Sequence, residues 1–169
     1  MISEALQSEI ISWAEDFKPL PVRWLQGKNL HITLVPPWYE EKVEKISSVL
    51  ESAIHGVAKP FEISFSRVAY GPNPRSPRLI WAEGVTSQQL LALKDHVERV
   101  LGIKPEHRPF QLHLTLARFR PEDFSQFPIK HLNEKVSWKD TVQSVALVES
   151  HLSSEGADYE VISEVLLMK

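Results

Sequence analysis

A histidine pattern that occurs twice constrains this chain more than any other feature of its sequence. Residues 111–118 read Gln-Leu-His-Leu-Thr-Leu-Ala-Arg, and residues 30–34 read Leu-His-Ile-Thr-Leu. Side chains alternate along a strand, so each copy places its His and Thr on one face and its apolar residues on the other. The two copies are separated by about half of the 169-residue chain. They therefore predict a duplicated unit in which one half contributes His31 and the other His113.

The remaining patterns predict helices mixed with antiparallel strands. Apolar residues at three- and four-residue steps indicate helices over residues 3–17, 40–55 and 87–101. A proline-rich, stiff and exposed loop is expected over residues 70–78. The expected strands cover residues 22–25, 30–35, 61–66, 79–83, 110–119, a short segment near Val136, 141–149 and 159–168, with Ser153, Ser154 and Gly156 in the last turn. This pattern is typical of an α+β fold in a single domain over residues 1–169.

Composition excludes several classes of protein. The chain has no cysteine, which excludes disulfides, thiolate metal sites and cysteine nucleophiles and favours a cytoplasmic location. No apolar run approaches the roughly 18 residues of a membrane span, and no signal pattern begins the chain. The net charge of −3 argues against a general nucleic-acid coat protein. Positive charge nevertheless gathers over residues 104–120, which either favours an anionic substrate near His113 or is surface charge of no consequence.

Two facing histidines suit phosphoryl transfer at a ribose phosphate. One ring takes a proton from the attacking oxygen, and the other gives a proton to the leaving oxygen. The hydroxyls of Thr33 and Thr115 can donate hydrogen bonds to the non-bridging oxygens, and Arg118 can add positive charge. Strict alternation puts Arg118 on the leucine face, so it reaches the site only if the strand bulges or ends near Ala117.

Two alternatives compete with this interpretation of the histidines. Each histidine can be an ordinary surface or core residue, which only geometry can decide. Zinc is the sharpest competing chemistry, because His31 and His113 with a third ligand can hold it. No clustered third ligand is evident, since the other histidines are expected at helix ends or in loops. They are His55, His96, His107, His131 and His151.

Several motifs recur in the order of one known family. The matching segments are residues 22–24, 29–34, 73–81, 108–118, 149–150 and 159–161. Over about residues 13–168 the chain thereby resembles the bacterial and archaeal RNA 2′,3′-cyclic phosphodiesterases, long called 2′-5′ RNA ligases, in the two-histidine phosphoesterase superfamily. The resemblance implies a two-lobed, pseudo-symmetric α+β fold, with antiparallel sheets lining a central cleft and helices outside.

The same resemblance implies an activity and roles for residues. His31 is the proton donor to the leaving oxygen and His113 activates water, while Thr33, Thr115 and Arg118 hold the phosphate. The expected substrate is RNA or a nucleotide with a 2′,3′-cyclic phosphate, and the product is a terminal 2′-phosphate. No metal or nucleotide cofactor is expected, and reverse ligation is a weaker family activity. We expect a monomer that does not associate with membranes.

Departures from the family pattern lie near the expected cleft. The strand that the family usually has before its first helix is missing or replaced, residues 35–38 read Val-Pro-Pro-Trp, and Leu112 replaces the usual proline. Trp38 can stack an RNA base or, as the stronger alternative, pack against the following helix. Arg75 and Arg78 can steer RNA phosphates or simply form a polar loop.

Two other functions remain open at this point. The chain can be a binding module that keeps the fold and holds RNA or nucleotide without turnover. It can also be a related phosphoesterase with a different small substrate.

Overall fold

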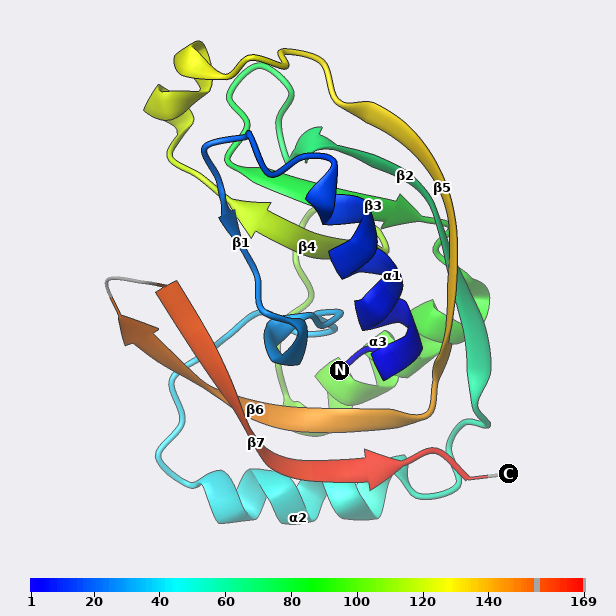
Figure 1. Cartoon of the computed structure of the whole chain (residues 1–169). Coiled ribbons are helices and arrows are strands. Elements are labelled where there is room, and N and C mark those ends of the chain that lie inside the picture. Colours follow the sequence, from blue (N-terminus) through cyan, green and yellow to red (C-terminus); the bar gives the residue numbers. More distant parts are fainter. Residues whose placement is uncertain (154–155, 169) are drawn as a thin grey trace. The chain divides into compact units, whose positions relative to one another are not determined.

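The computed structural model describes residues 1–153 and 156–168 and divides the chain into two compact units (Figure 1). Unit 1 comprises Met1–Ile32, Ile63–Val85 and Gln111–Asp140. Unit 2 comprises Thr33–Glu62, Thr86–Phe110 and Thr141–Lys169. Each unit therefore combines segments from both halves of the sequence. No described helix is both long enough and apolar enough to cross a membrane.

Unit 1 is built on a five-stranded sheet with the strand order β1-β4-β3-β2-β5. Its members are β1 (Arg23–Trp24), β2 (Phe61–Gly71), β3 (Leu79–Gly84), β4 (His113–Arg118) and β5 (Asn133–Val142). The pairs β1–β4, β4–β3 and β3–β2 are antiparallel. The sequence order of the strands differs from their spatial order, so β4 lies between two strands that precede it in the chain.

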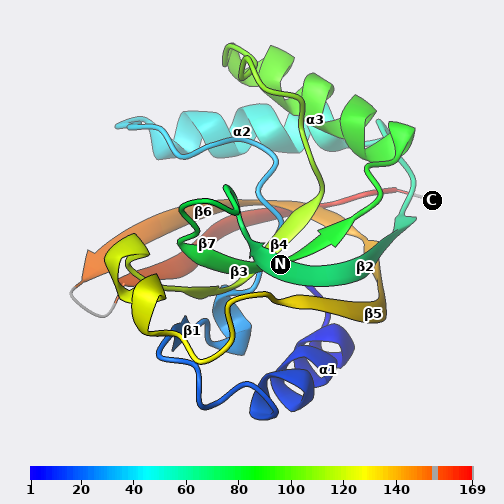
Figure 2. The same cartoon turned by 90° about the horizontal axis from the view of Figure 1, so that it is seen from above.

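Helix α1 (Glu4–Glu15) covers one face of this sheet (Figure 2). The hydroxyl of Ser3 caps the helix by accepting from the backbone N–H of Leu6 at 3.3 Å. Trp13 packs edge to face against Trp24 of β1 and Trp138 of β5, with ring centroids 6.2 and 5.7 Å apart. These contacts place α1 on the face of the sheet that carries Trp24 and Trp138, which we call the apolar face.

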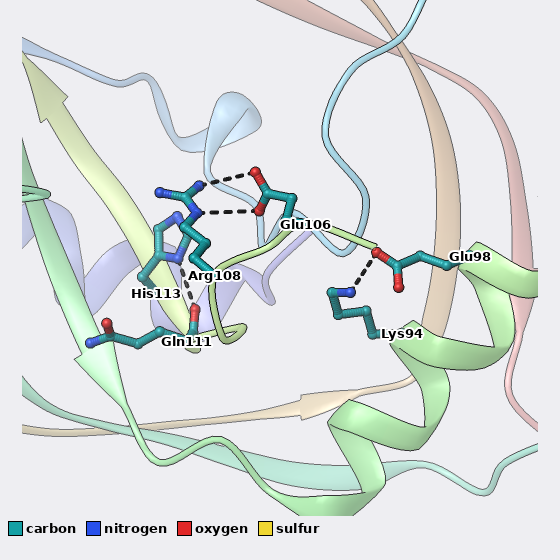
Figure 3. Close-up of polar contacts among 6 residues, drawn as sticks. All are labelled: Lys94, Glu98, Glu106, Arg108, Gln111 and His113. Atoms are coloured by element: carbon teal, nitrogen blue, oxygen red, sulfur yellow. Dashed lines mark hydrogen bonds and ion pairs between the residues drawn. The ribbon is translucent and has the colours of Figure 1, made fainter. Parts of the chain in front are cut away.

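Unit 2 contains α2 (Val43–Ile54), α3 (Gln88–Leu101) and the antiparallel pair β6 (Ser144–Ser153) and β7 (Gly156–Leu166). The ring N–H of His96 reaches the carbonyl of Ala53 at 2.9 Å and joins α3 to α2. Lys94 and Glu98, one turn apart in α3, form a buried ion pair at 2.5 Å (Figure 3). Gly102 ends α3 with a φ of 67°, a left-handed conformation that favours glycine.

The three predicted helices and most strands are confirmed, with shifts of a few residues at their ends. The predicted strand over residues 30–35 is wrong. A short 3-10 helix, η1 (Gly27–Asn29), precedes it, and Leu34 and Val35 bend before two prolines. Leu30 is instead held by its neighbours, since its N–H donates to Gly27 and its carbonyl accepts from Ile2. The segment thus lacks the continuous ladder partner that a strand needs.

Three smaller predictions also need correction. The short strand near Val136 is the ten-residue β5, and β6 begins only at Ser144, after β5 has ended at Val142. His96 lies within α3 and His151 within β6, instead of at a helix end or in a loop. The antiparallel pairing of β6 and β7 is confirmed, although Ser154 of the predicted turn lies outside the described residues.

Candidate active site

One face of the sheet in unit 1 carries His113 and Thr115, and we call it the histidine face. Leu112 and Leu114, which alternate with these two residues, are fully buried on the other side. Across the β3–β4 ladder His113 lies opposite Glu83, and Thr115 lies opposite Trp81. Directly opposite residues in antiparallel strands point to the same face. The alternation predicted from the sequence of β4 is therefore confirmed.

A bulge at Leu116 brings Arg118 onto the histidine face. Ile80 and Trp81 are consecutive in β3, but their partners in β4 are Ala117 and Thr115. Leu116 lies between these partners and has no opposite residue in β3. One extra residue reverses the alternation beyond it. Arg118 consequently pairs with Leu79 and shares a face with Thr115 and His113. The condition under which Arg118 was expected to reach the site is thus met.

Both histidines hold their rings in the same way. The Nδ1 of His31 lies 2.8 Å from the carbonyl oxygen of Asn29. The Nδ1 of His113 lies 2.9 Å from the carbonyl oxygen of Gln111, as Figure 3 shows. A carbonyl oxygen only accepts, so each Nδ1 carries the hydrogen and donates it. Each Nε2 is then the ring atom with a lone pair for proton transfer. This arrangement was not predicted from the sequence, although both carbonyls belong to the second residue before a histidine.

His31 belongs to unit 1, as His113 does, and it is sensitive to the charges there. Burial lowers the pKa of His31 below its usual value, against the carbonyl of Asn29, which raises it. The positive charges of the amino terminus, Arg118 and His113 lower this pKa further. Arg118 and His113 are therefore close enough to His31 to affect its protonation. In the absence of an anion this environment favours the neutral ring.

Trp81 supports the ring of His113. Their ring centroids are 5.0 Å apart at a tilt of 52°, and Trp81 is only 9% exposed. Gly71 of β2 makes room for the indole, because a Cβ there would overlap the ring of Trp81. Trp81 ends the matching segment 73–81, but no part in the site was predicted for it from the sequence.

The carboxylate beside His113 is neutralised within the sheet. Glu83 lies opposite His113 in β3, and Arg67 of β2 lies opposite Glu83. The Nε of Arg67 donates to Oε2 of Glu83 at 2.8 Å, and its Nη2 donates to the same oxygen. This ion pair offsets the negative charge that would otherwise face an anionic substrate at His113.

The other predicted site residues lie in different places. Thr33 and Trp38 belong to unit 2, where Trp38 is 40% exposed. Arg75 and Arg78 belong to the exposed loop of unit 1 between β2 and β3, and within the described part of the chain neither forms an ion pair. Arg108, which contributed to the positive cluster in the sequence, pairs with Glu106 at 3.3 Å (Figure 3).

A group of three side chains that can hold a metal lies in unit 2. Glu149, His151 and Glu160 are exposed on β6 and β7, and one ligand atom from each lies within 4.8 Å of the others. Across residues 1–153 and 156–168 this is the only such group of three, and it includes neither His31 nor His113.

Comparison with known proteins agrees with the family resemblance. The model of the 2′-5′ RNA ligase superfamily matches residues 3–153. A protein of Aeropyrum pernix named RNA 2′,3′-cyclic phosphodiesterase is 28% identical, with 86% of each chain covered. A protein of Methanocaldococcus jannaschii with the same name is 27% identical, with 96% of this chain and 95% of that protein covered.

Solved structures share the fold. A crystal structure of a Thermus thermophilus protein has a TM-score of 0.78 at 22% identity and covers 98% of this chain and 93% of its own. Escherichia coli LigT complexed with 3′-AMP has a TM-score of 0.73 at 22% identity and covers 100% and 95%. The expected fold class is thereby confirmed.

Proposed function

Because this chain belongs to the 2′-5′ RNA ligase superfamily, we propose that it hydrolyses the 2′,3′-cyclic phosphate ends of RNA or nucleotides to 2′-phosphates. The relatives named RNA 2′,3′-cyclic phosphodiesterase support the assignment of this chain as a cyclic phosphodiesterase, which is a hydrolase of phosphoric diesters. We further propose that His31 and His113 act as an acid–base pair without a metal. A weaker reverse reaction would join RNA ends through a 2′-5′ bond.

The proposed step is an in-line displacement at phosphorus. His113 takes a proton from water through Nε2, and the water oxygen forms a new bond to phosphorus. The bond from phosphorus to the 3′-oxygen breaks, and His31 gives its Nε2 proton to that oxygen. The product carries the phosphate on the 2′-oxygen. The negative charge of the substrate raises the pKa of His31 on binding, against the surroundings that lower it in the free protein.

Hydrogen-bond donors around the histidines would stabilise the transition state. Thr115 and Arg118 share the face of His113 and can bind the non-bridging oxygens. Thr33 is proposed to bind the same phosphate. For Arg75, Arg78 and Trp38 we propose contacts with the RNA beyond the reacting group.

The observation that carries the proposal is the shared arrangement of the two histidines in unit 1. Each presents Nε2 after its Nδ1 is taken by a carbonyl oxygen, and His31 is affected by the charges of both His113 and Arg118. An acid–base pair needs this combination of fixed rings and electrostatic proximity.

The test is turnover of a 2′,3′-cyclic nucleotide by wild type, His31→Ala, His113→Ala and the double variant. Each single change should cost roughly 10²–10⁴-fold in kcat, the usual contribution of a proton-transfer group. The double variant should be little worse than the worse single variant, because the two groups act as a unit. Circular dichroism and thermal unfolding establish that each variant is folded. A folded single variant with near-wild-type turnover contradicts the paired mechanism.

A binding module is the alternative that the departures at residues 35–38 favour. Pro36 and Pro37 replace residues that continue a strand in the family, and the segment is irregular here. Wild-type protein that binds the cyclic nucleotide but leaves it intact over prolonged incubation would support this alternative.

A further inference from the structure

Arg23 lies next to Arg118 on the histidine face, although nothing in the sequence suggested this pairing. In the β1–β4 ladder Arg23 is directly opposite Arg118, and Trp24 is opposite Ala117. Trp24 packs against Trp13 of α1, so it points to the apolar face. Arg23 precedes Trp24 in the strand and therefore points to the other face, where the bulge has already placed Arg118.

The two guanidinium groups form a like-charge pair without compensation. Both arginines are exposed, and within the described residues neither has an acidic partner. Opposite residues in antiparallel strands have Cβ atoms about 5 Å apart, and like charges at this spacing destabilise a sheet. By contrast, the cation of Arg67 on the same sheet is paired with Glu83. Arg23 and Arg118 thus form a site of uncompensated positive charge that can bind anions.

One reacting phosphate does not neutralise the charge of both arginines. A 2′,3′-cyclic phosphodiester carries a single negative charge, and Arg118, Thr115 and His113 share the face on which we propose that it binds. Arg23 lies one strand further out, on β1, which is the edge strand of the sheet. An RNA end supplies a second singly charged phosphate in the linkage just before its last nucleotide.

We infer that Arg23 is a specificity-determining residue that binds this neighbouring phosphodiester, so that the enzyme favours RNA ends over cyclic mononucleotides. The inference rests on the proposed function, because Arg118 must hold the reacting cyclic phosphate for Arg23 to meet the next one. The planar fork of arginine can donate two parallel hydrogen bonds to one phosphate, which lysine cannot do.

The test compares three substrates that end in adenosine 2′,3′-cyclic phosphate. The first is the cyclic mononucleotide, the second is a dinucleotide with an ordinary internal linkage, and the third is the same dinucleotide with a neutral methylphosphonate linkage. Wild type should show a kcat/KM about tenfold higher for the charged dinucleotide than for the neutral one, as expected for one charge-assisted hydrogen-bonded contact. Arg23→Gln should abolish that preference and leave turnover of the mononucleotide unchanged, while Arg23→Lys should keep part of the preference.

Lys18→Gln is the matched control. Lys18 is an exposed cation that follows α1, and its ammonium pairs with Glu15 of that helix. Its removal changes the net charge of the chain as Arg23→Gln does, and the substrate preference should remain. An Arg23→Gln variant that keeps the preference, or that loses turnover equally on all three substrates, would overturn the inference.

Equilibrium binding separates this inference from the proposed function. The same two dinucleotides are titrated into protein that carries both His31→Ala and His113→Ala, with and without Arg23→Gln. If wild type cleaves none of the substrates, the proposed function fails, but a binding preference for the charged linkage that depends on Arg23 still supports the second phosphate site. Equal binding of the charged and neutral dinucleotides overturns that site.

Discussion

Arg118 is on the histidine face only because Leu116 bulges, and its guanidinium has no acidic partner among the described residues. If it stabilises charge on the phosphate, Arg118→Ala should lower kcat for a cyclic nucleotide by about 10²-fold or more. Arg118→Lys should recover only part of the rate, because an ammonium lacks the planar fork. Thermal unfolding establishes that both variants are folded. Full activity of Arg118→Ala would show that Arg118 has only a structural role.

His31 should make the stability of the protein depend on pH. Its pKa is lowered in the folded state, chiefly by burial, so the unfolded chain takes up this proton first as the pH falls below about 6.5. The contribution of His31 to the free energy of unfolding is therefore fully present above the usual pKa of histidine. It is lost as the pH falls from there to the lowered value.

Urea unfolding of wild type and His31→Gln between pH 7.5 and pH 5 measures this contribution. The free energy of unfolding of wild type should fall more steeply with decreasing pH than that of the variant. All other histidines are common to both proteins and cancel in the comparison. Parallel curves would show that the surroundings of His31 do not lower its pKa.

At the scale of elements, contact between β2 and β3 fixes the ring behind His113. A Cβ added at Gly71 would overlap the indole of Trp81, so the indole must move, and the ring of His113 packs against it. We expect Gly71→Ala to cost about 1–3 kcal/mol of stability, as overpacking usually does, and to lower kcat/KM as well.

Gly27→Ala is the control for this prediction. A Cβ at Gly27 would come too close only to the amide oxygen at the flexible end of the Gln7 side chain, which can shift at little cost, and would make an ordinary contact with Ile11. Urea unfolding and turnover of a cyclic nucleotide should therefore change little in Gly27→Ala and clearly in Gly71→Ala. Similar results for the two variants would contradict the role of Trp81 in supporting the ring of His113.

Local pattern and long-range pairing explain what the sequence could predict. The alternation of Leu112, His113, Leu114 and Thr115 is a property of one strand, and it was predicted correctly. The bulge at Leu116 depends on the register between β3 and β4, which no single segment encodes. The segment that begins at Leu30 has strand-like composition, but the backbone of Leu30 bonds with Gly27 of η1 and with Ile2 near the start of the chain, and not with a neighbouring strand.

At the scale of the whole molecule, each compact unit draws on both halves of the sequence. His31 and His113 come from different halves, as the repeated pattern predicted, yet both belong to unit 1. Thr33 follows His31 by two residues and already belongs to unit 2. A repeat can therefore point to two residues without showing how the chain divides between the units. The facing pair Arg23 and Arg118 could not be predicted from the sequence either, because it depends on strands that are distant in sequence.

This division separates two kinds of chemistry. His31 and His113, which we propose as the acid–base pair, lie in unit 1, whereas Glu149, His151 and Glu160, which can hold a metal, lie in unit 2. The Nδ1 atoms of the paired histidines already donate to carbonyl oxygens, and proton transfer at Nε2 needs no metal-bound water. We therefore expect hydrolysis of a 2′,3′-cyclic phosphate to be the same before and after treatment with a chelator. His151→Gln, which removes one of the three ligands in unit 2, should also leave the rate unchanged. Activity that is abolished by chelation and restored by zinc would contradict the acid–base mechanism. The His151→Gln variant would then show whether the essential ion is bound by the group in unit 2, because only in that case would this variant be inactive with zinc present.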